Sequence, residues 1–113
     1  MNGTDLMLIM AGLADTLNGE GIDAEFKDFG IQGKYIVSEI SLGNIDSETV
    51  NRVISILESS GFKPLGKVRV NYEGEKTAYF FEGGGIDLYF IVQDNGESVL
   101  SAALPMTPSR NDD

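Results

Sequence analysis

The chain contains neither cysteine nor histidine. Without cysteine it forms no disulfide, offers no thiolate nucleophile and has no sulfur ligand for a metal. Without histidine it lacks the Ser-His and Cys-His nucleophile pairs, the usual imidazole ligands of zinc and the side chain that titrates near neutral pH. These absences exclude much nucleophilic and zinc-dependent chemistry, and we expect no cofactor and no metal.

Positive charge is also scarce, because the 113 residues include 18 acids and 8 bases, for a net charge of -10. Such a chain is repelled by nucleic acid and by anionic membranes. A local surplus of bases comes from Lys63, Lys67, Arg69 and Lys76, which is a weak footprint for binding phosphate. We therefore expect no direct nucleic-acid binding. A partner selected by charge would be a protein with a basic surface; the alternative is that the acidity serves only solubility.

The apolar stretch at residues 6–14 is too short to cross a bilayer. It follows Asp5 and no basic residue, whereas an export signal begins with positive charge. We expect a cytoplasmic protein with no membrane partner.

The length of 113 residues suits one domain, and a hydrophobic content of 42% is enough for a core without covalent cross-links. We expect a single domain at residues 1–104. The polar, proline-containing end at residues 105–113 is expected to be a disordered tail.

The most clearly delimited element is a helix that follows Asp46, whose carboxylate can accept a hydrogen bond from the amide of residue 48 or 49. Glycine closes helices in the left-handed conformation without strain, so Gly61 marks the end of this helix. Apolar residues between these limits recur with helical spacing at Val50, Val53, Ile54 and Leu57. The helix therefore has one buried side and needs a sheet to pack against.

The remaining elements are a helix and six short strands. The helix is expected at residues 5–18, and the strands at 22–27, 34–42, 67–72, 77–82, 86–93 and 98–104, with a turn at residues 30–33. The Asn95-Gly96 pair is typical of a two-residue hairpin turn. The order α-β-β-α-β-β-β-β predicts an α+β fold in two layers, with two helices on a mainly antiparallel sheet.

The first helix has an unusually wide apolar surface. Its main stripe consists of Leu6, Ile9, Met10, Leu13 and Leu17, and Met7, Leu8 and Ala14 widen that stripe. Such a helix is either buried on more than one side or in contact with a second molecule.

Short motifs give little support for catalysis. Gly30 and Gly33 stand too close together for a phosphate loop and lack the following Ser or Thr for magnesium. Residues 94–97 have oxygen ligands but lack the spacing of an EF-hand. Both segments are better explained as turns. Glu82 and Asp87 are a candidate carboxylate pair across a hairpin, although acids on an exposed strand need no catalytic role.

Several strands are apolar on both faces, which is the most informative functional signal. In the strand at 86–93, Tyr89 and Ile91 point away from the side shared by Leu88 and Phe90. A half-exposed antiparallel sheet alternates more cleanly. Either the helices cover both faces of the sheet, or another protein covers one of them. The candidate protein-binding residues are Tyr35, Val37, Phe80, Glu82, Asp87, Tyr89 and Ile91.

These observations favour a small acidic non-catalytic binding module that inhibits or antagonises a larger protein with a basic surface, for example one that binds nucleic acid. In size, acidity and mixed α/β order, the chain resembles acidic anti-CRISPR proteins, toxin immunity proteins and type III secretion chaperones at the level of class. The chaperone resemblance implies a homodimer that holds an unfolded segment of another protein, and it is the main alternative. A carboxylate-based enzyme, marked by two converging acids in a cleft, is a third.

Overall fold

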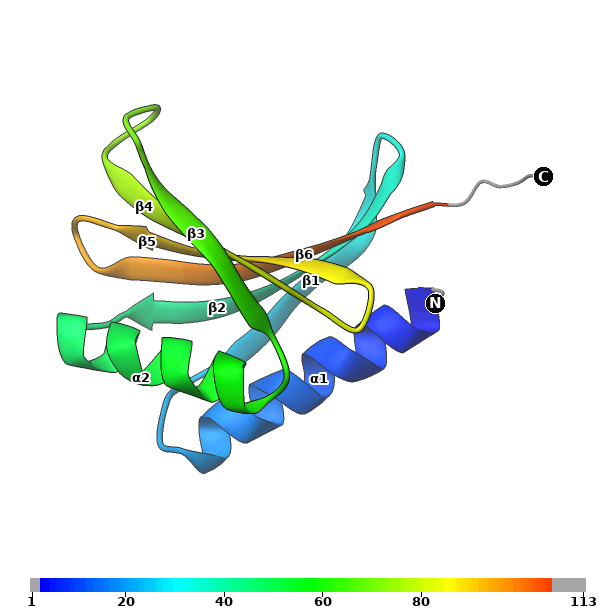
Figure 1. Ribbon diagram of the computed structural model, residues 1–113, viewed down its shortest axis with the longest axis horizontal. Coiled ribbons are helices and arrows are strands. Elements are labelled where there is room, and N and C mark those ends of the chain that lie inside the picture. The colour runs from blue at the N-terminus through cyan, green and yellow to red at the C-terminus, as the bar shows by residue number, and fades with distance from the viewer. Residues whose placement is uncertain (1–2, 107–113) are drawn as a thin grey trace.

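The computed structural model describes residues 3–106, apart from the side chain of Asp28. Two helices and six strands follow one another in the predicted order, which confirms the α+β class (Figure 1). The helices are α1 (Gly3–Gly19) and α2 (Ser47–Ser59), and the strands are β1 (Glu25–Gln32), β2 (Tyr35–Asn44), β3 (Lys63–Val70), β4 (Lys76–Gly83), β5 (Ile86–Gln93) and β6 (Glu97–Pro105).

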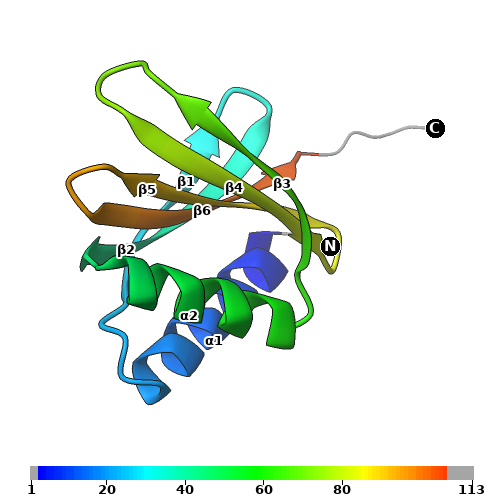
Figure 2. The same ribbon diagram turned by 60° about the vertical axis from the view of Figure 1, so that its left-hand side comes forward.

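The strands form one sheet in the order β1-β2-β6-β5-β4-β3, and every neighbouring pair is antiparallel. Four of the five pairings join strands that are consecutive in the chain. The fifth pairs β2 with β6, so the last strand closes the sheet beside the second one. Both helices lie on the same face of the sheet, which gives the predicted two layers (Figures 1 and 2).

Helix α2 begins and ends as predicted. The amide of Thr49 donates a hydrogen bond of 2.8 Å to the Asp46 carboxylate, which satisfies an N–H group that the first helical turn leaves free. At the other end, the amide of Phe62 donates to the carbonyl oxygen of Leu57 at 3.0 Å. Gly61 lies between them with a φ of 98°, where glycine carries no steric penalty.

The core is a single layer of apolar side chains between the helices and the sheet. Alternate residues of the inner strands point into it, because successive side chains of a strand face opposite sides. The large strand residues buried most deeply in this layer are Ile40, Ile86, Leu88, Phe90 and Leu100. The helices contribute Leu6, Met10 and Leu17 from α1, and Val53 and Leu57 from α2.

The first predicted strand is present, but its bounds were wrong, because β1 begins at Glu25 and ends at Gln32. Residues 22–24 lie outside the sheet, because the Asn18 side chain hydrogen-bonds both the N–H and the carbonyl of Ala24, each at 2.9 Å. The predicted turn at 30–33 belongs largely to β1, and the chain reverses at residues 33–34 instead. A bulge early in β1 shifts its register against β2, which the alternation of residue types does not reveal.

The bounds of β3 and β6 also differ from the prediction. Strand β3 begins at Lys63 and ends at Val70, so it starts before the predicted residue 67 and does not reach the predicted residue 72. It includes Pro64, which is tolerated because β3 is an edge strand with a bulge after this proline. Strand β6 continues to Pro105, and the next amide, of Met106, donates to the Lys34 carbonyl at 2.8 Å. Strand β6 therefore includes one residue, Pro105, of the segment predicted to be a tail. Residues 107–113 of the predicted tail lie outside the described residues.

Two buried serines on the helix side of the sheet differ in their hydrogen bonding. The hydroxyl of Ser98, which is 2% exposed, donates to the Gly96 carbonyl at 3.0 Å. The hydroxyl of Ser38, which is 1% exposed, has no hydrogen-bond partner among the described residues. A buried hydroxyl that lacks a partner costs free energy, whereas a bonded one is approximately neutral or favourable.

Substituting each serine by alanine should therefore have different effects on stability. We expect Ser38→Ala to leave the free energy of unfolding unchanged or to raise it by up to about 1 kcal/mol, because an unsatisfied polar group is removed. Ser98→Ala should lower it by about 1 kcal/mol, because it removes a hydrogen bond. Urea unfolding of both variants measures the difference, and an equal loss in the two would contradict this account of Ser38.

Candidate functional site

The face of the sheet opposite the helices has no cover from residues 3–106 (Figures 1 and 2). We call it the open face. The alternative in which the helices cover both faces of the sheet is therefore wrong. The strand registers place all seven candidate residues on the open face, and these residues are Tyr35, Val37, Phe80, Glu82, Asp87, Tyr89 and Ile91.

Aromatic and aliphatic side chains form the middle of the open face. Phe80 and Tyr89 stand opposite each other on β4 and β5, and their rings meet edge to face with centroids 5.6 Å apart. Ile91 pairs with Val99 of β6, which lies on the same face. Burial raises the pKa of the Tyr89 hydroxyl, and the nearby Asp87 carboxylate raises it further. Tyr89 is therefore neutral at physiological pH.

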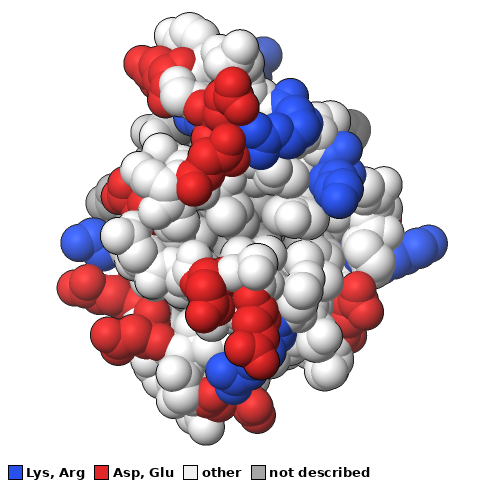
Figure 3. Space-filling view, turned by 90° about the vertical axis from the view of Figure 1, so that its left-hand side faces the viewer, with Lys and Arg blue, Asp and Glu red and all other residues white. Residues whose placement is uncertain are grey.

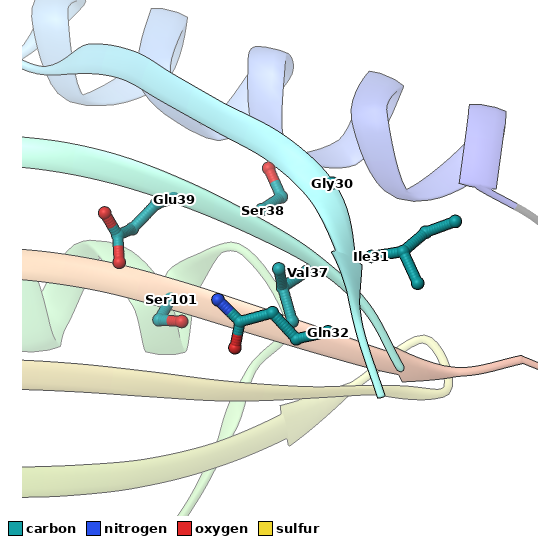
Figure 4. A pocket seen from close by; sticks show the side chains of 7 residues that line it. All are labelled: Gly30, Ile31, Gln32, Val37, Ser38, Glu39 and Ser101. Carbon is teal, nitrogen blue, oxygen red and sulfur yellow. The ribbon is translucent and has the colours of Figure 1, made fainter. Parts of the chain in front are cut away.

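The open face is concave. The β1–β2 and β3–β4 hairpins curve away from the helices at the two ends of the sheet, so that they rise on either side of β5 and β6 (Figure 1). Two hollows lie near β2, with volumes of about 260 and 300 Å³. The smaller is lined by Gly30, Ile31, Gln32, Val37, Ser38, Glu39 and Ser101 (Figure 4).

Glu39 lines both hollows and was not among the predicted site residues. It lies opposite Ser101, and Figure 4 shows both side chains on the same side of the sheet, whereas the Ser38 hydroxyl points toward α1. Glu39 is half-buried as a residue, and its carboxylate forms no hydrogen bond or ion pair within residues 3–106. A carboxylate without a partner favours the approach of a cation. Tyr35, Val37 and Glu39 are alternate residues of one strand, so the alternation of side chains could have placed Glu39 on the same face as the two predicted residues.

Acids border the apolar middle of the open face. Glu82 and Asp87 stand directly opposite each other on β4 and β5, so the register brings the predicted carboxylate pair together, and both residues are exposed. Glu25 also belongs to this face, and Lys27 lies 3.8 Å from it. Within residues 3–106, no three acidic side chains gather closely enough to hold a metal ion.

The predicted basic residues of β3 lie mainly on the helix side of the sheet. The guanidinium of Arg69 donates two hydrogen bonds to the Asp94 carboxylate, at 2.9 and 3.0 Å, and a third to Glu75 at 2.8 Å. The Lys67 ammonium lies 5.8 Å from the centre of the Tyr79 ring. Arg69 is thus occupied by two acids, which leaves less positive charge for a phosphate.

A further hollow of about 310 Å³ separates α2 from the outer strands at this end of the molecule. Figure 3 shows an uncharged band there, with charged side chains of both signs above it and mainly acidic ones below it. Val50, Tyr79 and Val92 supply apolar lining, and Asp94 lies at the border. No local pattern in the sequence predicts this hollow, because it depends on how far α2 lies from β4.

Comparisons of the chain with protein-family models, curated proteins and solved structures gave no match. Neither helix of the described part is long and apolar enough to span a membrane.

The pairing of Arg69 with Asp94 makes stability depend on pH in acid. The hydrogen bond from Arg69 lowers the pKa of Asp94 below its usual value of 3.8. The folded state is therefore stabilised by the ionised carboxylate above about pH 4, and this stabilisation is lost as the pH falls through the lower folded pKa. We expect Asp94→Asn to melt about 2 to 4 °C below the wild type at pH 7, with the gap closing below pH 4.

Thermal unfolding followed by circular dichroism at several pH values measures this gap. Asp23→Asn is a control for the loss of one negative charge, since Asp23 is exposed and forms no ion pair within residues 3–106. A gap for Asp94→Asn that stays constant down to pH 2.5 would show that the ion pair does not stabilise the fold.

Proposed function

We propose that this protein is a small, non-catalytic binding protein of the cytoplasm that inhibits or antagonises a larger protein with a basic surface. The supporting observation is that the seven candidate residues share one concave face that the helices leave uncovered. Aromatic side chains at the centre and charged groups at the border are typical of protein interfaces.

Charge and apolar contact would have separate roles in binding. The net charge of -10 and the acids of the open face attract a basic surface and speed the encounter. Burial of Phe80 and Tyr89 would set the lifetime of the complex, because dissociation rates depend on the packed centre of an interface. Glu39 would form an ion pair with a lysine or arginine of the partner. This would neutralise a carboxylate that forms no ion pair within residues 3–106.

An acidic homodimeric secretion chaperone is a second candidate. The observation that favours it is the exposure of Met7 and Leu8 on α1, at 39% and 66%. The wide apolar surface of this helix is thus only partly buried by the chain itself. A carboxylate-based enzyme has less support, because Glu82 and Asp87 are both exposed, whereas active sites usually lie in enclosed pockets.

Variants of the open face test the proposed function. Immobilised wild-type protein should capture a basic protein from a lysate of the source organism at low salt. Tyr89→Ala should weaken binding of that protein about 30-fold, as expected for a central aromatic residue, and Glu39→Gln should weaken it about tenfold. Titration calorimetry with the purified partner measures both affinities.

The control for these variants is Tyr72→Ala, which removes a tyrosine that is 71% exposed outside the strands. It should bind like the wild type. Melting temperatures confirm that each variant is folded, and Glu39→Gln keeps the size of the side chain. Equal affinity for all four proteins would show that binding does not use the open face.

The electrostatic part of the proposal predicts that association depends on salt. Between about 50 and 500 mM salt, the association rate constant should fall at least about tenfold, while the dissociation rate constant changes much less. Stopped-flow mixing measures both. A flat salt dependence of the association rate would leave only the apolar contacts in the proposal.

A further inference from the structure

A second uncovered surface lies on the helix side of the sheet, where the first turns of α1 meet the β1–β2 hairpin. It is a hollow of about 490 Å³ that we call the apolar groove, and it is lined by Gly3, Thr4, Met7, Phe29, Gly30, Ile31 and Ile36. None of these side chains is ionisable. Phe29 and Ile31 are 39% and 69% exposed, so the groove is open to solvent.

The exposed apolar area suits an interface between two proteins. Met7, Phe29 and Ile31, with Leu8 on the adjoining surface of α1, present on the order of 400 Å² of apolar surface. A standard interface buries about 800 Å² on each partner, somewhat more than half of it apolar. The apolar groove and its rim therefore supply about the apolar area that one side of a stable dimer needs.

The two edges of the sheet differ in how they are protected against pairing with another strand. Edge strand β3 carries Lys63, Pro64 and Lys67 together with a bulge, and these features oppose pairing. Edge strand β1 has a bulge and Lys27 only in its first half. Its second half, residues 29–32, is uncharged, contains no proline and borders the apolar groove.

We propose that a second copy of this chain occupies the groove, with residues 29–32 of β1 pairing antiparallel to the same residues of the other copy. A strand that pairs antiparallel with its own copy satisfies two-fold symmetry, so each groove closes against the other. Each copy has a net charge of -10, and the groove offers a contact without ionisable groups where repulsion between the copies is weakest. The residues that line the groove include no acid, so the groove offers no charge complement to a basic partner.

The proposed dimer does not depend on the proposed function. Its consequence for partner binding rests on that function. Antiparallel pairing of two β1 strands places the two-fold axis perpendicular to the sheet. Both open faces then lie on the same side of one continuous sheet, and all four helices lie on the other. A partner with two basic sites would bind both open faces, with a gain in affinity from the linkage.

Sedimentation velocity of the full chain between about 1 and 100 µM tests the dimer. We expect the wild type to dimerise with a Kd near 10 µM, and Ile31→Lys to raise that Kd at least about tenfold, because a charge must then be buried. The matched control is Leu65→Lys, which changes a residue that is 54% exposed on β3 and should leave the Kd unchanged. Both positions are exposed, and circular dichroism confirms that the variants are folded.

A wild-type protein that stays monomeric at 100 µM would overturn the proposal. A dimer that persists in Ile31→Lys but is lost in Tyr89→Ala would also overturn it, and would place the contact between copies on the open face instead. The partner-binding experiments use Tyr89→Ala and Glu39→Gln, so failure of the dimer leaves the test of the proposed function intact.

Discussion

The structure depends on the packing of both helices against one face of a single antiparallel sheet. Leu88, Phe90 and Leu100 are completely buried beneath the helices, and they form the strand side of the only apolar layer that the two-layer arrangement of residues 3–106 provides. Because side chains alternate along a strand, burying this set requires the other set to point away from the helices. Tyr89 and Ile91 therefore lie on the open face, where they are partly buried, as a direct consequence of burying their neighbours beneath the helices.

The proposed function follows from the types of side chain on the open face. A solvated sheet face normally carries polar residues, whereas this one has aromatic and branched side chains at its centre and a half-buried residue, Glu39, whose carboxylate lacks a partner within residues 3–106. The curvature of the outer hairpins makes the face concave and suits it to a protruding surface. The apolar groove beside α1 opens mainly on the opposite side of the sheet, and it shares Gly30 and Ile31 with the smaller hollow of the open face.

Local signals in the sequence were sufficient for the type and order of the elements, but not for the bounds of several strands. The cap at Asp46 and the glycine at Gly61 delimit α2. Alternation predicted which candidate residues of one strand share a side, and the strand registers bring all seven onto one face. What could not be predicted is nonlocal. The pairing of β2 with β6 brings Val99 beside Ile91 and gives Glu39 its surroundings, and the bulge in β1 changes which residues face the groove. The side on which each helix packs likewise depends on connections that no local pattern encodes.

Residues 3–106 leave the open face without a covering layer, and the accessibility of this face can be measured directly on the free protein. A soluble paramagnetic compound should broaden the methyl NMR signals of Val37 and Ile91 on the open face. The signals of Leu88 and Leu100, which the helices cover, should change little. Strong broadening of the first pair alone is the predicted result, and equal protection of both pairs would contradict the account.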